Sequence, residues 1–223
     1  MGQTLIAYLA AAVAAASHAA APPNGATAAL AASPLHGSVV LRARPDGKAL
    51  VRVGPRGPLG GPLVLGVVGI RGRWVKVTAE ALPNGHFAWA EFGRDVAVHP
   101  IQWALRASLS RRLLYVLRDG RIVRTMRVGI GAASSPTPVG RFAIAEKLTG
   151  VFGPALGSHI LVLTARQPRL PAGWNTRITY YVAIHSGSGR GSAVSAGCLH
   201  ATKADVRYLM RTVPLGTAVQ ILR

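Results

Sequence analysis

The carboxy-terminal half contains several short runs rich in apolar residues, a pattern typical of β-strands. Residues 112–118 and 122–128 are two such runs, and the Asp119-Gly120 pair between them is the strongest short-range signal for a β-hairpin. Further strands are expected over residues 141–145, 159–164, 179–184 and 218–222. The pattern therefore predicts a second half that consists mainly of sheet.

One segment of this half has helical periodicity instead. Thr202 is a good N-cap, Asp205 follows it three residues later, and Pro214 ends the pattern. The apolar residues between them fall on one helix face: Val206, Leu209, Met210 and Val213. The sequence predicts a mainly β domain over residues 102–223 with one short amphipathic helix.

The preceding part of the chain, from His36, consists of short apolar runs separated by turn signals. These signals are found at residues 45–47, 54–55, 60–62, 71–72 and 83–85. Short strands with frequent turns are typical of a small barrel or sandwich. Residues 36–101 resemble, in this pattern, a bacterial SH3-like β-barrel domain. We expect Trp74 and Trp89 to pack in its core and not to line a ligand groove.

The amino terminus resembles an export signal. Leu5 to Ala16 is an unbroken apolar run, and Ser17-His18-Ala19 then places small residues at the two positions that a signal peptidase inspects. The run is shorter than the ~20 apolar residues that span a bilayer. We predict a signal peptide or short anchor over residues 1–19, an Ala/Pro-rich linker over 20–35, and export to the extracytoplasmic space.

The amino-acid composition limits the kinds of catalytic and metal sites that the chain is expected to contain. The 26 basic and seven acidic residues give a net charge of +19, and the acidic residues are too scattered to predict carboxylate-built metal sites or paired-carboxylate catalysis. Such a charge favours polyanionic partners, but the basic residues are dispersed and lack interleaved aromatic residues, which argues against nucleic acid. A single cysteine and the absence of His-Glu-x-x-His predict no disulfide, no metal and no cofactor.

Candidate chemistry is concentrated between residues 181 and 200. His185 ends a predicted strand, and Cys198 lies in a turn of small residues shortly before the predicted helix. A thiol near a helix N-terminus and an imidazole is expected to be held as the nucleophilic thiolate. The Gly/Ser-rich segment between the two residues is able to fold back and bring them together. Gly197 permits a tight turn whose N–H groups would face a developing oxyanion.

The residues around this pair resemble the bacterial L,D-transpeptidases. The resemblance rests on Ile-His-Ser at 184–186 and Val-Ser-Ala-Gly-Cys-Leu at 194–199, together with Val128–Gly131 and Pro136–Phe142 upstream. It covers residues 104–223 approximately. It implies an L,D-transpeptidase-type β-sandwich with one short helix after the catalytic cysteine.

The resemblance also implies roles for individual residues. Cys198 would attack the carbonyl of the third residue of a peptidoglycan stem tetrapeptide and release D-Ala, and an amine would resolve the thioester. His185 would be the general base and acid. Ser186 would orient that imidazole through its backbone, Gly197 and Cys198 would supply oxyanion N–H groups, and Ser195 would shape the turn.

Two residues depart from the family pattern, in which a His precedes the Gly-Cys pair and an Arg follows two positions after the Cys. Here Ala196 replaces the former and His200 the latter, where it would contribute to substrate binding. The separation of 13 residues between His185 and Cys198 is short for the family.

Two other functions remain open: an L,D-carboxypeptidase with water as acceptor, and a catalytically silent protein that only binds cell wall. Serine D,D-transpeptidases are excluded, because no lysine has a serine three residues before it. The expected partners are stem peptides and the anionic wall, with no nucleic acid and no membrane span beyond the possible anchor.

Overall fold

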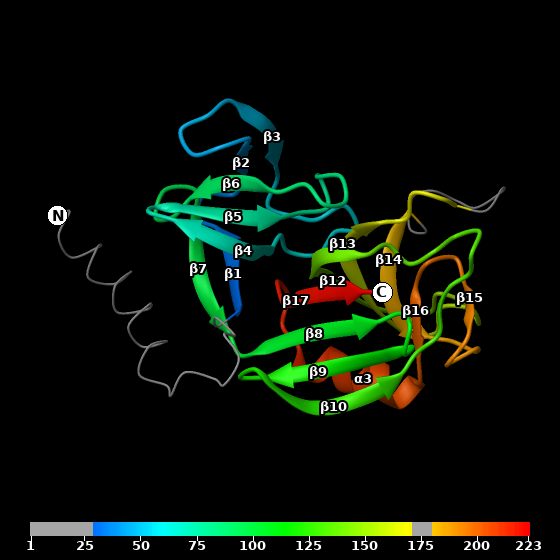
Figure 1. The fold of residues 1–223 in the computed structure, drawn as a ribbon. Helices are drawn as coiled ribbons and strands as arrows, with labels where there is room; N and C mark the ends of the chain where they lie inside the picture. The colour runs from blue at the N-terminus through cyan, green and yellow to red at the C-terminus, as the bar shows by residue number, and fades with distance from the viewer. Residues whose placement is uncertain (1–28, 171–179) are drawn as a thin grey trace.

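The computed structural model describes residues 29–170 and 180–223, and these form two large β-sheets, a separate two-stranded pair and one helix (Figure 1). The segment predicted as a signal peptide or anchor and the first part of the predicted linker lie outside the described residues. In the described part of the chain, no helix is long and apolar enough to cross a membrane.

The first sheet contains seven strands from the amino-terminal part of the described chain, in the spatial order β3-β2-β6-β5-β4-β1-β7. The strands are β1 (Ala29–Pro34), β2 (Val39–Arg42), β3 (Ala49–Val53), β4 (Leu65–Arg71), β5 (Trp74–Thr78), β6 (Ala88–Glu91) and β7 (Val96–Ile101). All neighbouring pairs are antiparallel. This part is therefore β-rich, as expected, whereas its likeness to an SH3-like barrel stays a prediction.

The predicted linker over residues 20–35 ends before Ala29, because Ala29–Pro34 form β1. This strand lies between β4 and β7, and its Ala31 and Ala32 are 3% and 0% exposed. Small alanine side chains allow close packing there, but they leave no apolar–polar alternation for sequence analysis to detect. Trp74 is buried as expected, whereas Trp89 is half-buried, with the ammonium of Lys76 5.9 Å from its ring centroid.

The second sheet contains eight strands of the described chain, in the order β10-β9-β8-β17-β12-β13-β14-β16. They are β8 (Trp103–Ser108), β9 (Leu113–Arg118), β10 (Arg121–Arg127), β12 (Gly140–Thr149), β13 (His159–Arg166), β14 (Tyr181–Ser186), β16 (Leu199–Ala201) and β17 (Ala218–Leu222). The β17–β8 and β14–β16 pairs are parallel. A separate short pair joins β11 (Ile130–Gly131) to β15 (Ala193–Ser195).

The hairpin and the helix predicted for this half are confirmed. The turn between β9 and β10 has positive φ at both Asp119 (50°) and Gly120 (77°), the backbone that an Asp-Gly hairpin requires. The helix α3 (Lys203–Thr212) begins after Thr202, whose hydroxyl accepts from the Asp205 N–H at 3.0 Å. Val206, Leu209 and Val213 are buried in the main core.

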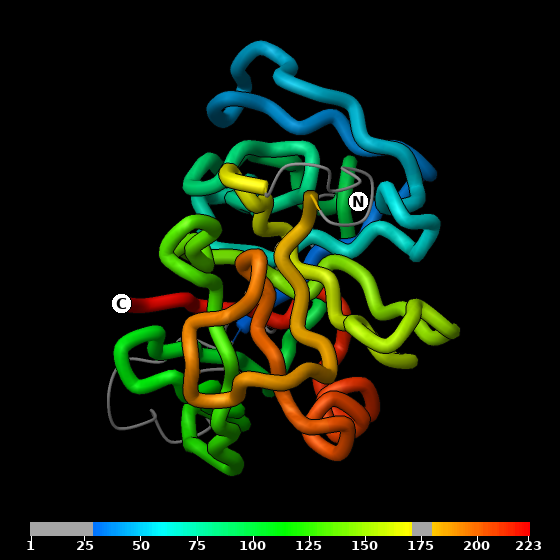
Figure 2. Tube along the Cα trace, turned by 90° about the vertical axis from the view of Figure 1, so that its right-hand side faces the viewer, coloured from blue at the N-terminus to red at the C-terminus, as the bar shows by residue number. Residues whose placement is uncertain are grey.

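The main core lies between α3 and one face of the second sheet. Leu161, Leu163, Val182, Ile184 and Leu199 all belong to it, and α3 contacts β13 and β14. Residues of β13, β14 and β16 between these positions have their side chains on the opposite face, because side chains alternate along a strand. In Figure 2, β14 and β16 run side by side at the front of the molecule, with α3 beneath them. The face opposite α3 carries the candidate site.

Candidate functional site

The strand register places Cys198 and His185 on the same face of the second sheet. In the parallel pair of β14 and β16, His185 lies opposite His200 and Ile184 opposite Leu199. The residues one position earlier, Ala183 and Cys198, therefore lie level with each other. Both are two residues before the paired histidines and so have their side chains on the same face. The ring centroids of His185 and His200 are 4.7 Å apart. Neighbouring β13 continues both rows, with Ile160 opposite His185 and Val162 opposite Ala183.

A cavity of about 190 Å³ opens over this face of the sheet. Its lining includes Cys198, His185 and His200, the turn residues Ser195 and Ala196, and apolar side chains of β13, β14 and the β12–β13 loop. Cys198 is partly buried and His185 is 3% exposed. The nucleophile and base candidates of the sequence analysis are thus brought together in one mostly apolar cavity.

The protonation state of Cys198 differs from the sequence-based expectation. Burial raises the pKa of its thiol to about 11, and a contact with the Ala183 backbone lowers it only in part. The expectation of a stabilised thiolate is therefore wrong. β16 separates Cys198 from α3, so the helix N-terminus lies beyond the strand, and the apolar surroundings favour the neutral thiol.

His185 is also neutral near pH 7. Burial lowers its pKa to about 4; the Ser186 carbonyl opposes this shift, whereas the neighbouring His200 adds to it. Nδ1 of His185 lies 2.9 Å from the Ser186 carbonyl oxygen, which only accepts hydrogen bonds. Nδ1 therefore carries the proton and Nε2 has the free lone pair. This arrangement allows Nε2 to accept a proton from a thiol.

Ser195 fixes the turn that carries Cys198. Its hydroxyl donates to the Cys198 carbonyl at 2.6 Å and accepts from the Gly197 N–H at 3.1 Å. The Gly197 N–H predicted to face an oxyanion is thus occupied by Ser195, because the turn folds back on itself. The remaining candidate from that prediction is the Cys198 N–H.

Two buried side chains outside the predicted site hold the same turn. Nε2 of Gln167 donates to the Ala196 carbonyl at 2.8 Å, and the Thr137 hydroxyl donates to the Gly197 carbonyl at 2.9 Å. Gly197 has φ +113°, and a Cβ there would collide with the Gln167 amide. We call Thr137, Gln167 and Ser195 the turn clamp.

The sequence contained partial signals for the clamp. Thr137 lies within the Pro136–Phe142 motif quoted for the family resemblance, but nothing local indicated its contact with Gly197, 60 residues away. Gln167 directly follows the apolar strand β13 and is 2% exposed. A polar residue at that position could have been noticed, although its partners are set by the tertiary fold.

His200 is held on the other side of the cavity by the Gly/Ser-rich segment. Its Nδ1 lies 3.0 Å from the Ser188 carbonyl, and its backbone exchanges two hydrogen bonds with Gly129. Ala196 takes part through its backbone carbonyl. The two positions that depart from the family pattern are therefore both built into the cavity wall.

The pH dependence of thiol alkylation tests the neutral resting state. Because only the thiolate reacts, we expect the rate of Cys198 alkylation by iodoacetamide to rise about tenfold per pH unit from pH 7 to 10, with no plateau. The urea-unfolded protein is the control, and its rate should level off about two pH units earlier. A plateau below pH 8 in the folded protein would indicate a preformed ion pair and contradict this assignment.

Removal of one clamp hydroxyl tests its contribution. Thr137→Val leaves the Gly131 N–H and the Gly197 carbonyl without their buried partner, so we expect the free energy of unfolding to fall by about 1–3 kcal/mol in urea titrations. Thr149→Val, at an exposed position of β12, is the matched control and should change stability by less than about 0.5 kcal/mol. Equal effects of the two substitutions would show that the clamp contributes nothing.

Comparison with known proteins identifies the family of the carboxy-terminal part of the chain. Residues 102–221 match the YkuD family model, the L,D-transpeptidase catalytic domain. The YkuD protein of Bacillus licheniformis is 30% identical over 124 residues, which cover 54% of this chain and 66% of that protein. L,D-transpeptidase 1 of Mycobacterium tuberculosis is 28% identical over 122 residues, 52% of this chain and 49% of the relative.

Solved structures to which the chain is similar include an L,D-transpeptidase from Mycobacterium smegmatis, with a TM-score of 0.43 and 15% identity over 67% of this chain and 91% of that one. The L,D-transpeptidase LdtMt1 in complex with imipenem gives a TM-score of 0.46 and 18% identity over 86% and 97% of the two chains. The chain spans about half to two thirds of the length of the two curated relatives. Because the family model covers more than half of it, the chain belongs to the YkuD family of L,D-transpeptidase catalytic domains.

Proposed function

We propose that this protein is an exported peptidoglycan L,D-transpeptidase that uses Cys198 as its nucleophile. The observation that carries the proposal is the placement of Cys198 and His185 on the same sheet face, in adjacent rows that line one apolar cavity, within a chain that belongs to the L,D-transpeptidase family. A thiol beside an imidazole with a free Nε2 provides the nucleophile and the general base that acyl transfer requires.

The first half-reaction forms a thioester. The Cys198 thiol gives its proton to Nε2 of His185 as sulfur bonds to the carbonyl carbon of the third stem residue. The C–N bond to the terminal D-Ala then breaks, and the His185 imidazolium protonates the leaving amine. Because both groups rest in their neutral forms, proton transfer accompanies attack and no ion pair precedes it.

The second half-reaction transfers the acyl group to an amine of a neighbouring stem. His185 accepts the proton of the attacking amine, the thioester C–S bond breaks, and the thiolate recovers a proton from the imidazolium. The Cys198 N–H is the proposed donor to the oxyanion in both steps. The turn clamp supports this role, because it fixes the carbonyl of Cys198 and both peptide groups before it.

The positive charge supports a location at the wall. Wall polymers are anionic, so a chain with a net charge of +19 is attracted to its substrate, although salt screens this attraction beyond about 8 Å at physiological ionic strength. We propose that the protein acts outside the cytoplasmic membrane on stem peptides.

Turnover of a stem tetrapeptide tests the proposed chemistry. We expect D-Ala release together with a crosslinked dimer, no release by Cys198→Ala, and a rate about 10²–10⁴-fold lower for His185→Ala, because general base catalysis contributes this much. His99→Ala, at an exposed position of β7, is the matched control and should keep the wild-type rate.

The products separate the alternatives. Tripeptide without dimer, in the presence of an amine acceptor, would identify an L,D-carboxypeptidase. Wild-type protein that releases no D-Ala and retains binding to wall sacculi would contradict catalysis and indicate a wall-binding protein.

A further inference from the structure

A loop of the amino-terminal sheet is fastened to the face of the second sheet that carries Cys198. The loop lies between β3 and β4, and the backbone N–H groups of its Leu59 and Gly61 donate to the two carboxylate oxygens of Glu146 on β12, at 2.9 and 2.6 Å. Glu146 is fully buried. A carboxylate with two backbone donors, one on each oxygen, fixes the position of the loop.

An irregularity in β12 places Glu146 on this face. Ile144 lies opposite Leu163 and Glu146 opposite Val162, so two residues of β12 correspond to one of β13. Without this bulge, Glu146 would share the core face of Ile144. With it, Glu146 shares a face and a row with Val162 and Ala183, and this row ends at the level of Cys198.

The loop is shaped for this contact. A Cβ at Gly61 would lie 2.7 Å from Oε2 of Glu146, so only glycine allows the backbone to come so near. Between the two anchored N–H groups, Leu59 packs against the cluster of Ile160, Val162 and Ala183. These three residues also line the cavity, and Cys198 packs against the same cluster.

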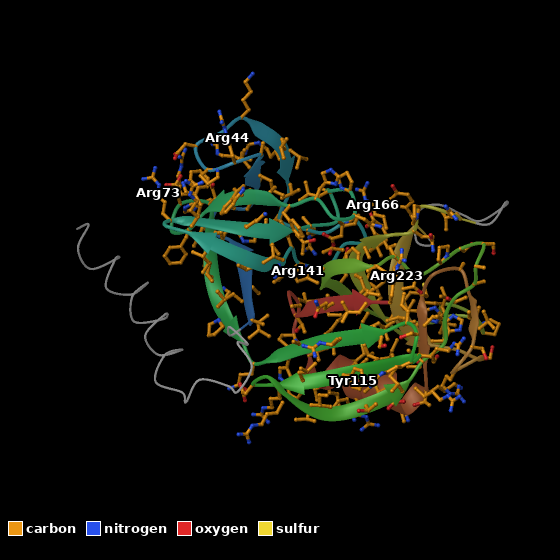
Figure 3. The ribbon with its side chains drawn as sticks, in the orientation of Figure 1. Arg44, Arg73, Tyr115, Arg141, Arg166 and Arg223 are labelled. Atoms are coloured by element: carbon orange, nitrogen blue, oxygen red, sulfur yellow. The ribbon has the colours of Figure 1, made fainter. Side chains whose placement is uncertain are left out.

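Further contacts hold the two sheets together beside the loop. The hydroxyls of Thr78 and Thr164 lie 3.1 Å apart in buried surroundings, and Asn84 exchanges two hydrogen bonds with the Arg166 backbone, at 2.6 and 2.8 Å. Arg166 lies at this boundary in Figure 3. Its guanidinium donates to the carbonyl of Glu80, in the loop between β5 and β6 of the first sheet. The loop therefore rests on a fixed boundary between the sheets.

We infer that Leu59 is a positioning residue for the acyl donor: it supports the apolar floor of the cavity beside Cys198, and this floor receives the aliphatic part of the donor peptide. The amino-terminal sheet then contributes to the catalytic site, in addition to any role in attachment to the wall. This inference rests on the proposed function, since it assigns the donor peptide to the cavity.

The effect of Leu59→Ala on steady-state turnover of the stem tetrapeptide tests this role. We expect KM to rise about tenfold, because an unsupported floor would loosen its contacts with the aliphatic part of the donor, which carry at least this discrimination, while kcat stays within about twofold. Leu59→Met, which conserves volume, should restore the wild-type KM. Glu146→Gln, which has one oxygen acceptor for two N–H donors, should raise KM in the same direction.

Leu50→Ala is the matched control, because Leu50 belongs to β3 of the same sheet and is 55% exposed. Thermal unfolding of each variant shows whether it is folded; Leu59→Val, which removes one methylene, replaces Leu59→Ala if that variant unfolds and should give a smaller rise in KM. Wild-type kinetics for the folded Leu59 variant would overturn the inference while leaving the proposed function intact. Absence of D-Ala release by wild type would instead overturn the proposed function.

Discussion

The parallel pairing of β14 with β16 is the constraint on which the rest of the site depends. It connects two segments separated by the Gly/Ser-rich loop, and its register places His185 opposite His200 with Cys198 one repeat away on the same face. A shift by one residue would turn Cys198 toward the core that holds Leu199. The turn clamp protects this register, because it holds the backbone immediately before β16 through three buried side chains.

The same burial that fixes the geometry determines the electrostatics. An apolar face raises the pKa of the Cys198 thiol and lowers that of His185, so the pair rests neutral and charge would develop only during the proposed reaction. A site of this kind depends on donors placed in advance to stabilise that charge. The first sheet supports the apolar floor of the cavity, because the contact of its β3–β4 loop with Glu146 holds Leu59 against that floor.

Local patterns predicted the parts of the fold that local chemistry determines. The Asp119-Gly120 hairpin and the cap at Thr202 need only neighbouring residues, so their sequence signals were sufficient. The pairing of Cys198 with His185 was predicted from the resemblance to a family. The spacing of the two residues along the sequence would not have been enough to predict it. The thiolate expectation failed because burial depends on packing across the whole sheet. The role of Glu146 depends on a bulge in β12, for which alternation along the strand gives no sign.

Intact-protein mass spectrometry after incubation with imipenem tests the central claim most directly, namely that Cys198 is an acyl-transfer nucleophile assisted by His185. The account predicts one covalent adduct on the wild-type chain, none on Cys198→Ala, and slower formation on His185→Ala. A wild-type chain that remains unmodified, or an adduct that persists on Cys198→Ala, would contradict it.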